Sequence, residues 1–264
     1  MTYVLHALPA SHPCMTVERA LQLKELPYRR VEHIPVAHKL TVRAHAGAGT
    51  VPALVFPDGR RLAGSRAILR ALEAHPPSLL PADPERRRVV ERAEEWGDQV
   101  LQPLVRRVTW AALRRRPSAV MPYSASARLP VPRPLARASA PLIARAARAV
   151  NDGSDPNVRA DLAHLGHHFD RIDRWIADGV LGGEEPTTGD LQLGPSIALL
   201  ASVEDLAGIL GDRPALTLAR RWFPAYPEGS VPAGTLPPEW LSDEVSSASW
   251  APWATGPSAG SSAG

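Results

Sequence analysis

The sequence is poor in cysteine, because Cys14 is the only one among its 264 residues. A single thiol cannot form a disulfide within the chain, so dithiol redox chemistry inside one chain is excluded. Proteins without disulfides are typical of the reducing cytosol, and we expect a cytoplasmic protein. The sequence also lacks an apolar run of the ~18–20 residues that a membrane helix needs, and its first residues lack the pattern of a signal peptide. We therefore expect no membrane partner.

Acidic residues are missing from a long central stretch. Between Asp98 and Asp152 there is no Asp or Glu, whereas ten arginines fall in that interval. We prefer to interpret this stretch as a solvated arginine face, because a basic run alone is a weak signal. The alternative is a surface that attracts anionic ligands, lipid or nucleic acid through the segment from Arg106 to Arg148.

The sequence does contain the means to form a core, with 44% hydrophobic and 22% charged residues. Its first 77 residues follow the order β-α-β and then β-β-α, which predicts an α/β domain over residues 1–77. The turn signature Pro57-Asp58-Gly59 separates the last two strands. We expect strands at Tyr3–Leu8, Tyr28–Ile34, Thr50–Phe56 and Arg61–Leu62, and helices after Ser11 and from Ser65 to about His75.

The chain after Asp83 has a helical pattern, which predicts an all-helical domain over residues 83–228. Residues 229–264 are rich in Pro, Gly, Ser and Ala and should form a disordered tail, although Trp240, Trp250 and Trp253 have enough apolar area to bind a surface. Between Pro117 and Pro134 we expect a loop. The expected helices are Pro84 to about Arg115, Leu135–Val150, Val158–Ile176 and a buried central helix Leu191–Leu206.

Four short motifs, in this order and spacing, resemble the glutathione transferase superfamily. The segment Ser11 to Val17 resembles the start of the first helix in serine-type members, notably the delta and theta classes. Thr50 to Leu54 resembles the segment with the family's cis-proline, and Ser65 to Ile68 the start of its third helix. Thr187 to Asp190 resembles the capping box of the central helix. The resemblance covers about 190 residues and implies a thioredoxin-like N-terminal domain followed by a helical C-terminal domain.

The resemblance also implies a site for a thiol. A strand that leads into a helix leaves free amides and the positive end of the helix dipole at the loop, which favours an anion such as a thiolate. By resemblance, Ser11 donates a hydrogen bond to the glutathione sulfur. The other implied binding residues are Val51, Pro52, Ser65 and Arg66, with His12, Cys14 and Lys39 as secondary candidates.

These motifs also have purely structural interpretations, which stay open at the level of sequence. Ser11 and Ser65 fit as helix caps, and Pro52 fits as the trans-proline end of a loop. Asp190 fits as a capping residue, and Cys14 is more often a buried, inert side chain than a reactive one.

A metal site has weaker support in the sequence. His164 and His168 are one helical turn apart and Asp161 lies one turn earlier, which is a ligand spacing found for zinc. The sequence offers them no clear further ligand, so we favour a solvated helix flank. We expect no metal cofactor.

The sequence departs from the family at Gly64, where an acidic or Gln residue normally precedes the serine. That residue helps to hold the γ-glutamyl ammonium, so its loss weakens glutathione binding or changes the thiol that is used. The arginine- and alanine-rich composition suggests a high-GC bacterium, and some of these use other low-molecular-weight thiols such as mycothiol.

The sequence thus predicts a glutathione S-transferase-like enzyme that stabilises a thiolate for attack on a small electrophile, with isomerisation or reduction as variants. Glutathione or another small thiol is the expected co-substrate, and the resemblance implies a homodimer and a role in detoxification. One alternative is a non-catalytic binding or scaffolding module. Another is anion or nucleic-acid binding through the Arg106–Arg148 segment, which we regard as the weaker hypothesis.

Overall fold

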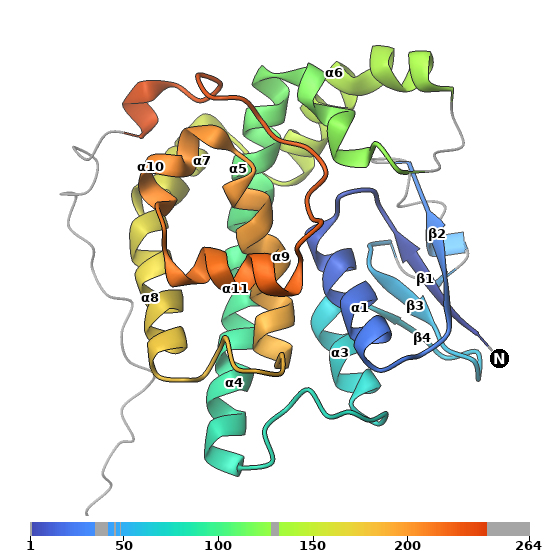
Figure 1. The fold of residues 1–264 in the computed structure, drawn as a ribbon. Coiled ribbons are helices and arrows are strands. Elements are labelled where there is room, and N and C mark those ends of the chain that lie inside the picture. The colour runs from blue at the N-terminus through green and yellow to red at the C-terminus, as the bar shows by residue number, and fades with distance from the viewer. Residues whose placement is uncertain (1, 35–41, 45, 48, 128–131, 242–264) are drawn as a thin grey trace, which may run out of the picture.

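A computed structural model describes residues 2–34, 42–44, 46–47, 49–127 and 132–241. Its first part is a four-stranded sheet in the order β2-β1-β3-β4, with β1 parallel to β2 and antiparallel to β3. Two helices, α1 and α3, lie between this sheet and the helical part of the chain (Figure 1). The elements are β1 (Tyr3–Ala7), α1 (His12–Leu23), β2 (Tyr28–Glu32), β3 (Ala53–Val55), β4 (Arg61–Ala63) and α3 (Ser65–Leu72).

The remainder is helical, so the predicted thioredoxin-like domain followed by a helical domain is confirmed as a fold class. Helices α4 and α5 follow one another through a π-helical turn at Gly97–Leu101, which makes the predicted long helix continuous but locally wider. The helices are α4 (Pro84–Trp96), α5 (Gln102–Arg115), α6 (Arg133–Val150), α7 (Asp155–Ala163), α8 (Leu165–Ala177), α9 (Thr188–Ala201), α10 (Ala207–Leu210) and α11 (Pro214–Trp222).

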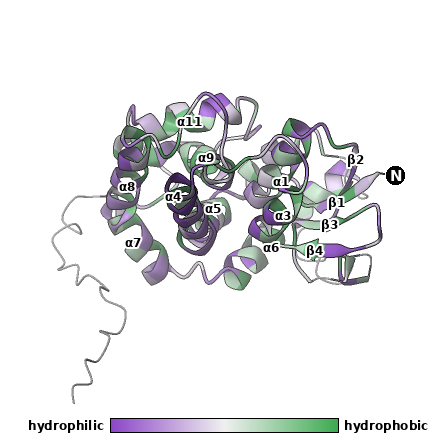
Figure 2. Ribbon diagram, turned by 90° about the horizontal axis from the view of Figure 1, so that it is seen from below, coloured by the Kyte–Doolittle hydropathy of each residue, from purple (hydrophilic) through white to green (hydrophobic). Residues whose placement is uncertain are grey.

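Helix α9 is the centre of the core. All but the last of its residues are buried, and it contacts α1, α4, α5 and α11 (Figure 2). The predicted capping box is confirmed, because Thr187 accepts from the Asp190 N–H and Asp190 accepts from the Thr187 N–H. Gly97 permits the close approach of α4 to α9, since a Cβ there would lie 2.8 Å from Cδ1 of Leu193.

Two sequence predictions require correction in the helical part. The single helix expected over Val158–Ile176 is two helices, because the His164 N–H bonds to the Asp161 carbonyl in a tighter turn that ends α7. The loop expected after Pro117 contains two short 3-10 turns, Pro117–Val120 and Pro122–Ser124.

Part of the expected tail is structured. Val231 pairs with Val203 beside the end of α9, and Trp240 is buried against the guanidinium of Arg115, 4.3 Å from the ring centroid. The low-complexity composition concealed these contacts, although the apolar area of Trp240 was a signal for one of them. Trp250 and Trp253 lie outside the described residues.

Candidate functional site

The predicted site residues meet at one end of the sheet. The antiparallel pairing of β3 with both β1 and β4 brings the last residues of β1, the first of β3 and the last of β4 to the same edge. Ser11 follows β1, Pro52 immediately precedes β3, and Ser65 follows β4. The fold therefore brings three residues that are far apart in sequence to the same end of the sheet.

The segment before β3 leaves the Val51 backbone N–H available for pairing. The Val51–Pro52 peptide bond is cis, in agreement with the family resemblance. The Pro52 carbonyl accepts a hydrogen bond of 2.9 Å from the Gly64 N–H, which ties this segment to the start of α3. Within the part of the chain that the structure describes, the Val51 N–H donates to no backbone carbonyl. An extended peptide could therefore pair with it.

Ser11 stands at the start of α1 without acting as a side-chain cap. Its backbone carbonyl accepts from the N–H groups of Cys14 and Met15 at 2.9 and 3.0 Å, whereas its hydroxyl makes no capping hydrogen bond to the helix. Ser11 therefore occupies the N-cap position, as the sequence predicted, but its side chain does not cap the helix. Ser11 as a residue is half-buried at the positive end of the helix, where an anion is stabilised.

The two neighbours of Ser11 in the secondary set are buried. Cys14 lies in the core, and burial raises the pKa of its thiol, opposed by hydrogen bonds from Ser11 and Leu8. His12 joins α1 to α9, because its Nδ1 lies 2.8 Å from the Ser196 hydroxyl. Burial, and then the charge of Arg106, lower the pKa of His12 well below its ordinary value, so this ring is neutral. Lys39 lies outside the described residues.

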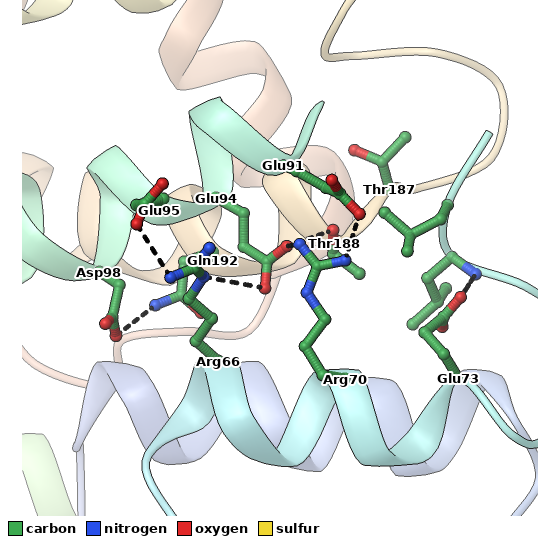
Figure 3. A network of polar contacts seen from close by, with 12 residues as sticks. Arg66, Arg70, Glu73, Glu91, Glu94, Glu95, Asp98, Thr187, Thr188 and Gln192 are labelled. Atoms are coloured by element: carbon green, nitrogen blue, oxygen red, sulfur yellow. Dashed lines mark hydrogen bonds and ion pairs between the residues drawn. The ribbon is translucent and has the colours of Figure 1, made fainter. Parts of the chain in front are cut away.

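Ser65 is buried against the helical part of the chain, with 1% of its surface exposed. Its hydroxyl accepts hydrogen bonds from the side-chain amides of Gln102 at 3.2 Å and Gln192 at 3.1 Å. The same Gln192 amide also donates to Asp98 at 3.1 Å (Figure 3). Helix α3 is preceded by Gly64 at φ +90°, so Gly64, and not Ser65, occupies the N-cap position.

Arg66 faces α4 rather than the end of the sheet. Its guanidinium pairs with Glu95 at 3.2 Å and lies 3.9 Å from Glu94 (Figure 3). One turn further along α3, Arg70 pairs with Glu91 at 2.8 Å and with Glu94 at 2.6 Å. These ion pairs hold α3 against α4, and they leave Arg66 engaged with carboxylates of the protein itself.

A hollow of about 580 Å³ lies next to Gly64, at the edge of this network. Burial raises the pKa of Asp98, which lines it, and the charges of Arg66 and Arg106 oppose the shift. Asp98 thus places a carboxylate next to Gly64, the position at which related proteins carry an acidic or Gln side chain. The hollow is lined by Ala63, Gly64, Arg66, Ala67, Arg70, Glu91 and Asp98.

A groove of about 470 Å³ begins on the other side of the loop before α1. Pro9 and Ala10, the two residues before Ser11, form one end of it, and Met15 continues the wall along α1. The Tyr226 hydroxyl donates to the Ala10 carbonyl at 2.9 Å and closes the loop against the end of the helical part. The other aromatic residues that line the groove are Tyr123, Trp222 and Phe223.

Sequence reasoning missed the amide pair that contacts Ser65 and the carboxylate beside it. A signal was present, because Asp98, Gln102 and Arg106 recur every four residues on one helical face. Gln192 and Ser196 repeat the same spacing on α9, which is otherwise without polar side chains beyond its first turn. Polar residues at a fixed spacing on a buried helix indicate partners on another element.

The histidines considered as metal ligands have other partners. His164 Nδ1 lies 2.8 Å from the Ala160 carbonyl, and Asp161 pairs with Arg107 at 2.6 Å. Among the residues described, no group of three His, Cys, Asp or Glu side chains is arranged to hold a metal ion. No helix of that same set has the length and apolar character needed to cross a bilayer.

Comparison with known proteins agrees with this geometry. Residues 5–84 match the family model described as glutathione S-transferase, N-terminal domain. No curated protein matches the chain. These findings support the glutathione transferase superfamily, and the delta or theta class stays a prediction.

Solved structures with the same fold extend over most of the chain. A glutathione S-transferase from Rhodospirillum rubrum F11 is 24% identical, with a TM-score of 0.55 over 84% of this chain and 86% of its own. One from Methylobacterium radiotolerans, in complex with glutathione sulfonate, is 24% identical, with a TM-score of 0.51 over 88% and 95%. The β-etherase LigF from Sphingobium sp. strain SYK-6 is 20% identical, with a TM-score of 0.61 over 86% and 97%. At these identities the likeness establishes the fold.

Proposed function

We propose that this protein is a glutathione S-transferase-like enzyme that binds glutathione or a related small thiol at the end of the sheet and stabilises its thiolate for attack on a small electrophile. The observation that carries the proposal is the Ser11 hydroxyl, which makes no capping hydrogen bond at the start of α1 and lies at the same end of the sheet as Val51. In the protein without ligand it bonds to the Cys14 thiol, and a bound thiolate would compete for it. In this scheme Ser11 donates a hydrogen bond to the thiolate and lowers the pKa of the thiol. Serine is not the nucleophile.

The peptide part of the thiol would lie along the segment before β3. Its cysteinyl carbonyl would accept from the Val51 N–H, in the manner of a strand added to a sheet edge. The N-terminus of α3 at Ser65 would attract the γ-glutamyl carboxylate. Asp98 would supply the negative charge for the γ-glutamyl ammonium that residue 64, a glycine, cannot supply.

The reaction would form a bond between the thiol sulfur and an electrophilic carbon. The thiol proton passes to solvent, and the leaving group departs with its electron pair. The groove that begins at Pro9 and Ala10 has the size of a small-molecule site and aromatic walls, and we assign it to the electrophile. Isomerisation or reduction by the same thiolate, a homodimeric state, a role in detoxification and a cytoplasmic location belong to this proposal.

A non-catalytic module is the second candidate, because Ser65 and Arg66 are already satisfied. Two glutamine amides occupy the Ser65 hydroxyl, and Arg66 is paired with α4. A ligand carboxylate would have to compete with these contacts. Together with Gly64, this arrangement favours a fold that has lost affinity for the thiol.

A thermal-shift series separates the two candidates. Wild type, Ser11→Ala and Ser118→Ala are each heated with glutathione, an S-alkyl glutathione and mycothiol. A ligand that binds only the folded state raises the midpoint, and Ser118 is an exposed serine that serves as the matched control. We expect one thiol to raise the midpoint of all three proteins, with turnover of a chloronitrobenzene-type substrate lost only in Ser11→Ala. If no thiol raises the midpoint of any protein and no turnover is detected, the non-catalytic module is favoured.

A further inference from the structure

Helix α6 presents an unpartnered apolar ridge to solvent. The large apolar side chains that are exposed in the described part of the chain are Leu135, Leu142 and Val150, with 59%, 71% and 58% of their surfaces exposed, and all three lie on α6. Such residues are unusual on a solvated helix when they gather on one element. Helix α6 lies at the outer edge of the molecule, across one end of α5 (Figure 1).

The ridge points away from the body of the protein. A stripe of small residues, Ala136, Ala140, Ala144 and Ala147, is the buried face of α6 and packs toward α5. At 100° per residue, Leu135 and Leu142 fall on the opposite side of the helix. The exposed Ala138 and Ala149 lie on that same side. The helix thus has one apolar face that is covered and a second that is not.

Exposed arginines without an ion-pair partner among the described residues lie on α6 and at the end of α5. Arg137 and Arg145 are exposed on α6, and Arg114 and Arg116 are exposed at the end of α5. None of the four makes an ion pair with a described residue. The neighbouring Arg115 and Arg148, by contrast, do form ion pairs, both with Asp155, at 3.3 and 2.6 Å. Since residues 99–151 contain no Asp or Glu, nothing on the segment itself offsets the four free charges.

An apolar hollow of about 670 Å³ opens beside the first turn of α6. Arg133 and Arg137 belong to its lining, next to apolar walls. An amphipathic helix with exposed leucines and arginines on one surface is the pattern of segments that lie in the plane of an anionic bilayer surface. The apolar walls are formed mainly by Met121, Pro122, Ala125, Pro134 and Ala138.

We propose that α6 docks the protein peripherally on an anionic lipid surface, with Leu135 and Leu142 in the headgroup boundary and Arg145, which lies about 60–80° from them around the helix, on lipid phosphates. The expectation that no membrane partner exists rested on the lack of a spanning segment, and peripheral docking needs none. A second copy of this chain is a poorer occupant, because facing α6 ridges would bring arginine against arginine. An acidic protein or a nucleic acid would use the charges but would leave the leucines without a role.

The test is co-sedimentation of the full chain with vesicles of phosphatidylcholine alone and of phosphatidylcholine with phosphatidylglycerol. We expect binding to the mixed vesicles only. Arg145→Gln should weaken partitioning by about fivefold, as expected for one charge removed near the surface, whereas Arg137→Gln, on another side of the helix, should have a smaller effect. Leu135→Gln with Leu142→Gln should weaken it by at least about tenfold. The matched control, Arg92→Gln with Arg159→Gln, removes two exposed charges on α4 and α7 and should leave binding unchanged.

A labelled variant reports insertion directly. Because Cys14 is buried, a thiol-reactive, environment-sensitive fluorophore reacts selectively with Ala138→Cys on the exposed side of α6. We expect a blue shift of its emission with mixed vesicles. Failure to sediment with them overturns the proposal. So does binding that depends on the arginines but not on the leucines, especially if duplex DNA competes equally well, because that outcome describes a polyanion surface.

Discussion

Gln192 on α9 and Ser65 at the start of α3 are joined by a hydrogen bond of 3.1 Å that links the sheet-containing part of the chain to the helical part. The bond is buried, and Gln102 on α5 approaches the same hydroxyl from 3.2 Å. In the protein without ligand, the Ser65 hydroxyl therefore has a structural role as the acceptor of two hydrogen bonds from the helical part.

Replacement of Ser65→Ala should lower the free energy of unfolding by about 1–2 kcal/mol without any ligand, because two buried amides lose their shared acceptor. Urea denaturation of the ligand-free protein measures this change, and Ser118→Ala, at an exposed site, is the control. A residue that served the ligand alone would give equal stabilities for the wild type and Ser65→Ala.

Replacement of Arg70→Met should destabilise the protein by about 3–5 kcal/mol, because it removes a close partner of a buried carboxylate. The Glu94 side chain is fully buried, and its Oε2 lies 2.6 Å from Arg70 and 2.9 Å from the Thr188 hydroxyl. Burial raises the pKa of Glu94, and Arg70 opposes that shift.

The comparison for Arg70→Met is Arg88→Met on α4, whose ion pair with Glu85 is exposed on both sides. Such a pair contributes about 0–1 kcal/mol. Chemical denaturation of the two variants under the same conditions gives the difference. Equal losses of stability would mean that the Arg70–Glu94 contact is not buried in solution.

The stability of the protein should fall as the pH drops below the ordinary pKa of histidine. Burial lowers the pKa of His12 well below its value of 6.5 in the unfolded chain, so the unfolded state binds a proton that the folded state does not. This contribution is complete above about pH 6.5 and is lost at up to ~1.4 kcal/mol per pH unit below it. His168, whose burial lowers its pKa to about 4, acts with the same sign.

Denaturation curves between pH 7.5 and 5 measure this slope. His12→Asn and His168→Gln should each flatten it, whereas His167→Gln, at an exposed position, should not. Identical slopes in the wild type and the variants at His12 and His168 would contradict the assignment of these rings as neutral.

The sequence allowed prediction of features whose cause is local. Thr187 and Asp190 are three residues apart and form a capping box by themselves, and the short apolar run from Tyr3 to Leu8 located β1 almost to the residue. The Ser11 position at the start of α1 was evident for the same reason. The sequence did not reveal that the Ser11 hydroxyl makes no capping bond, because this depends on the side-chain rotamer that the loop permits.

Features that depend on distant partners escaped prediction. Ser65 meets Gln192 across 127 positions, and no local pattern specifies which polar residue of α9 it will contact. Arg66 follows Ser65 directly, yet α3 turns its side chain by about 100° from that of Ser65, toward the acidic face of α4. The break at His164 was hidden because the apolar stripe continues through it in sequence.

Asp98→Asn should weaken glutathione binding by about 10- to 150-fold if Asp98 faces the γ-glutamyl ammonium, as an ionic hydrogen bond in a partly buried site contributes about 1.5–3 kcal/mol. Calorimetric titration with glutathione and with its des-amino analogue tests this pairing. We expect the analogue to bind the wild type and Asp98→Asn equally. Glu91→Gln, which removes another carboxylate from the same hollow, is the control. A similar loss with both ligands would assign Asp98 to the fold alone.

The proposed function depends on the stabilisation of a bound thiolate by Ser11. Ultraviolet titration of the glutathione thiolate bound to the wild type and to Ser11→Ala measures this stabilisation. We expect the bound thiol to ionise at a lower pH than free glutathione in the wild type and close to the free value in Ser11→Ala. Turnover should fall by about 10²–10³ in that variant, as for the loss of one donor to an anion. An equal, lowered thiol pKa in both proteins, with unchanged turnover, would contradict the proposed stabilisation.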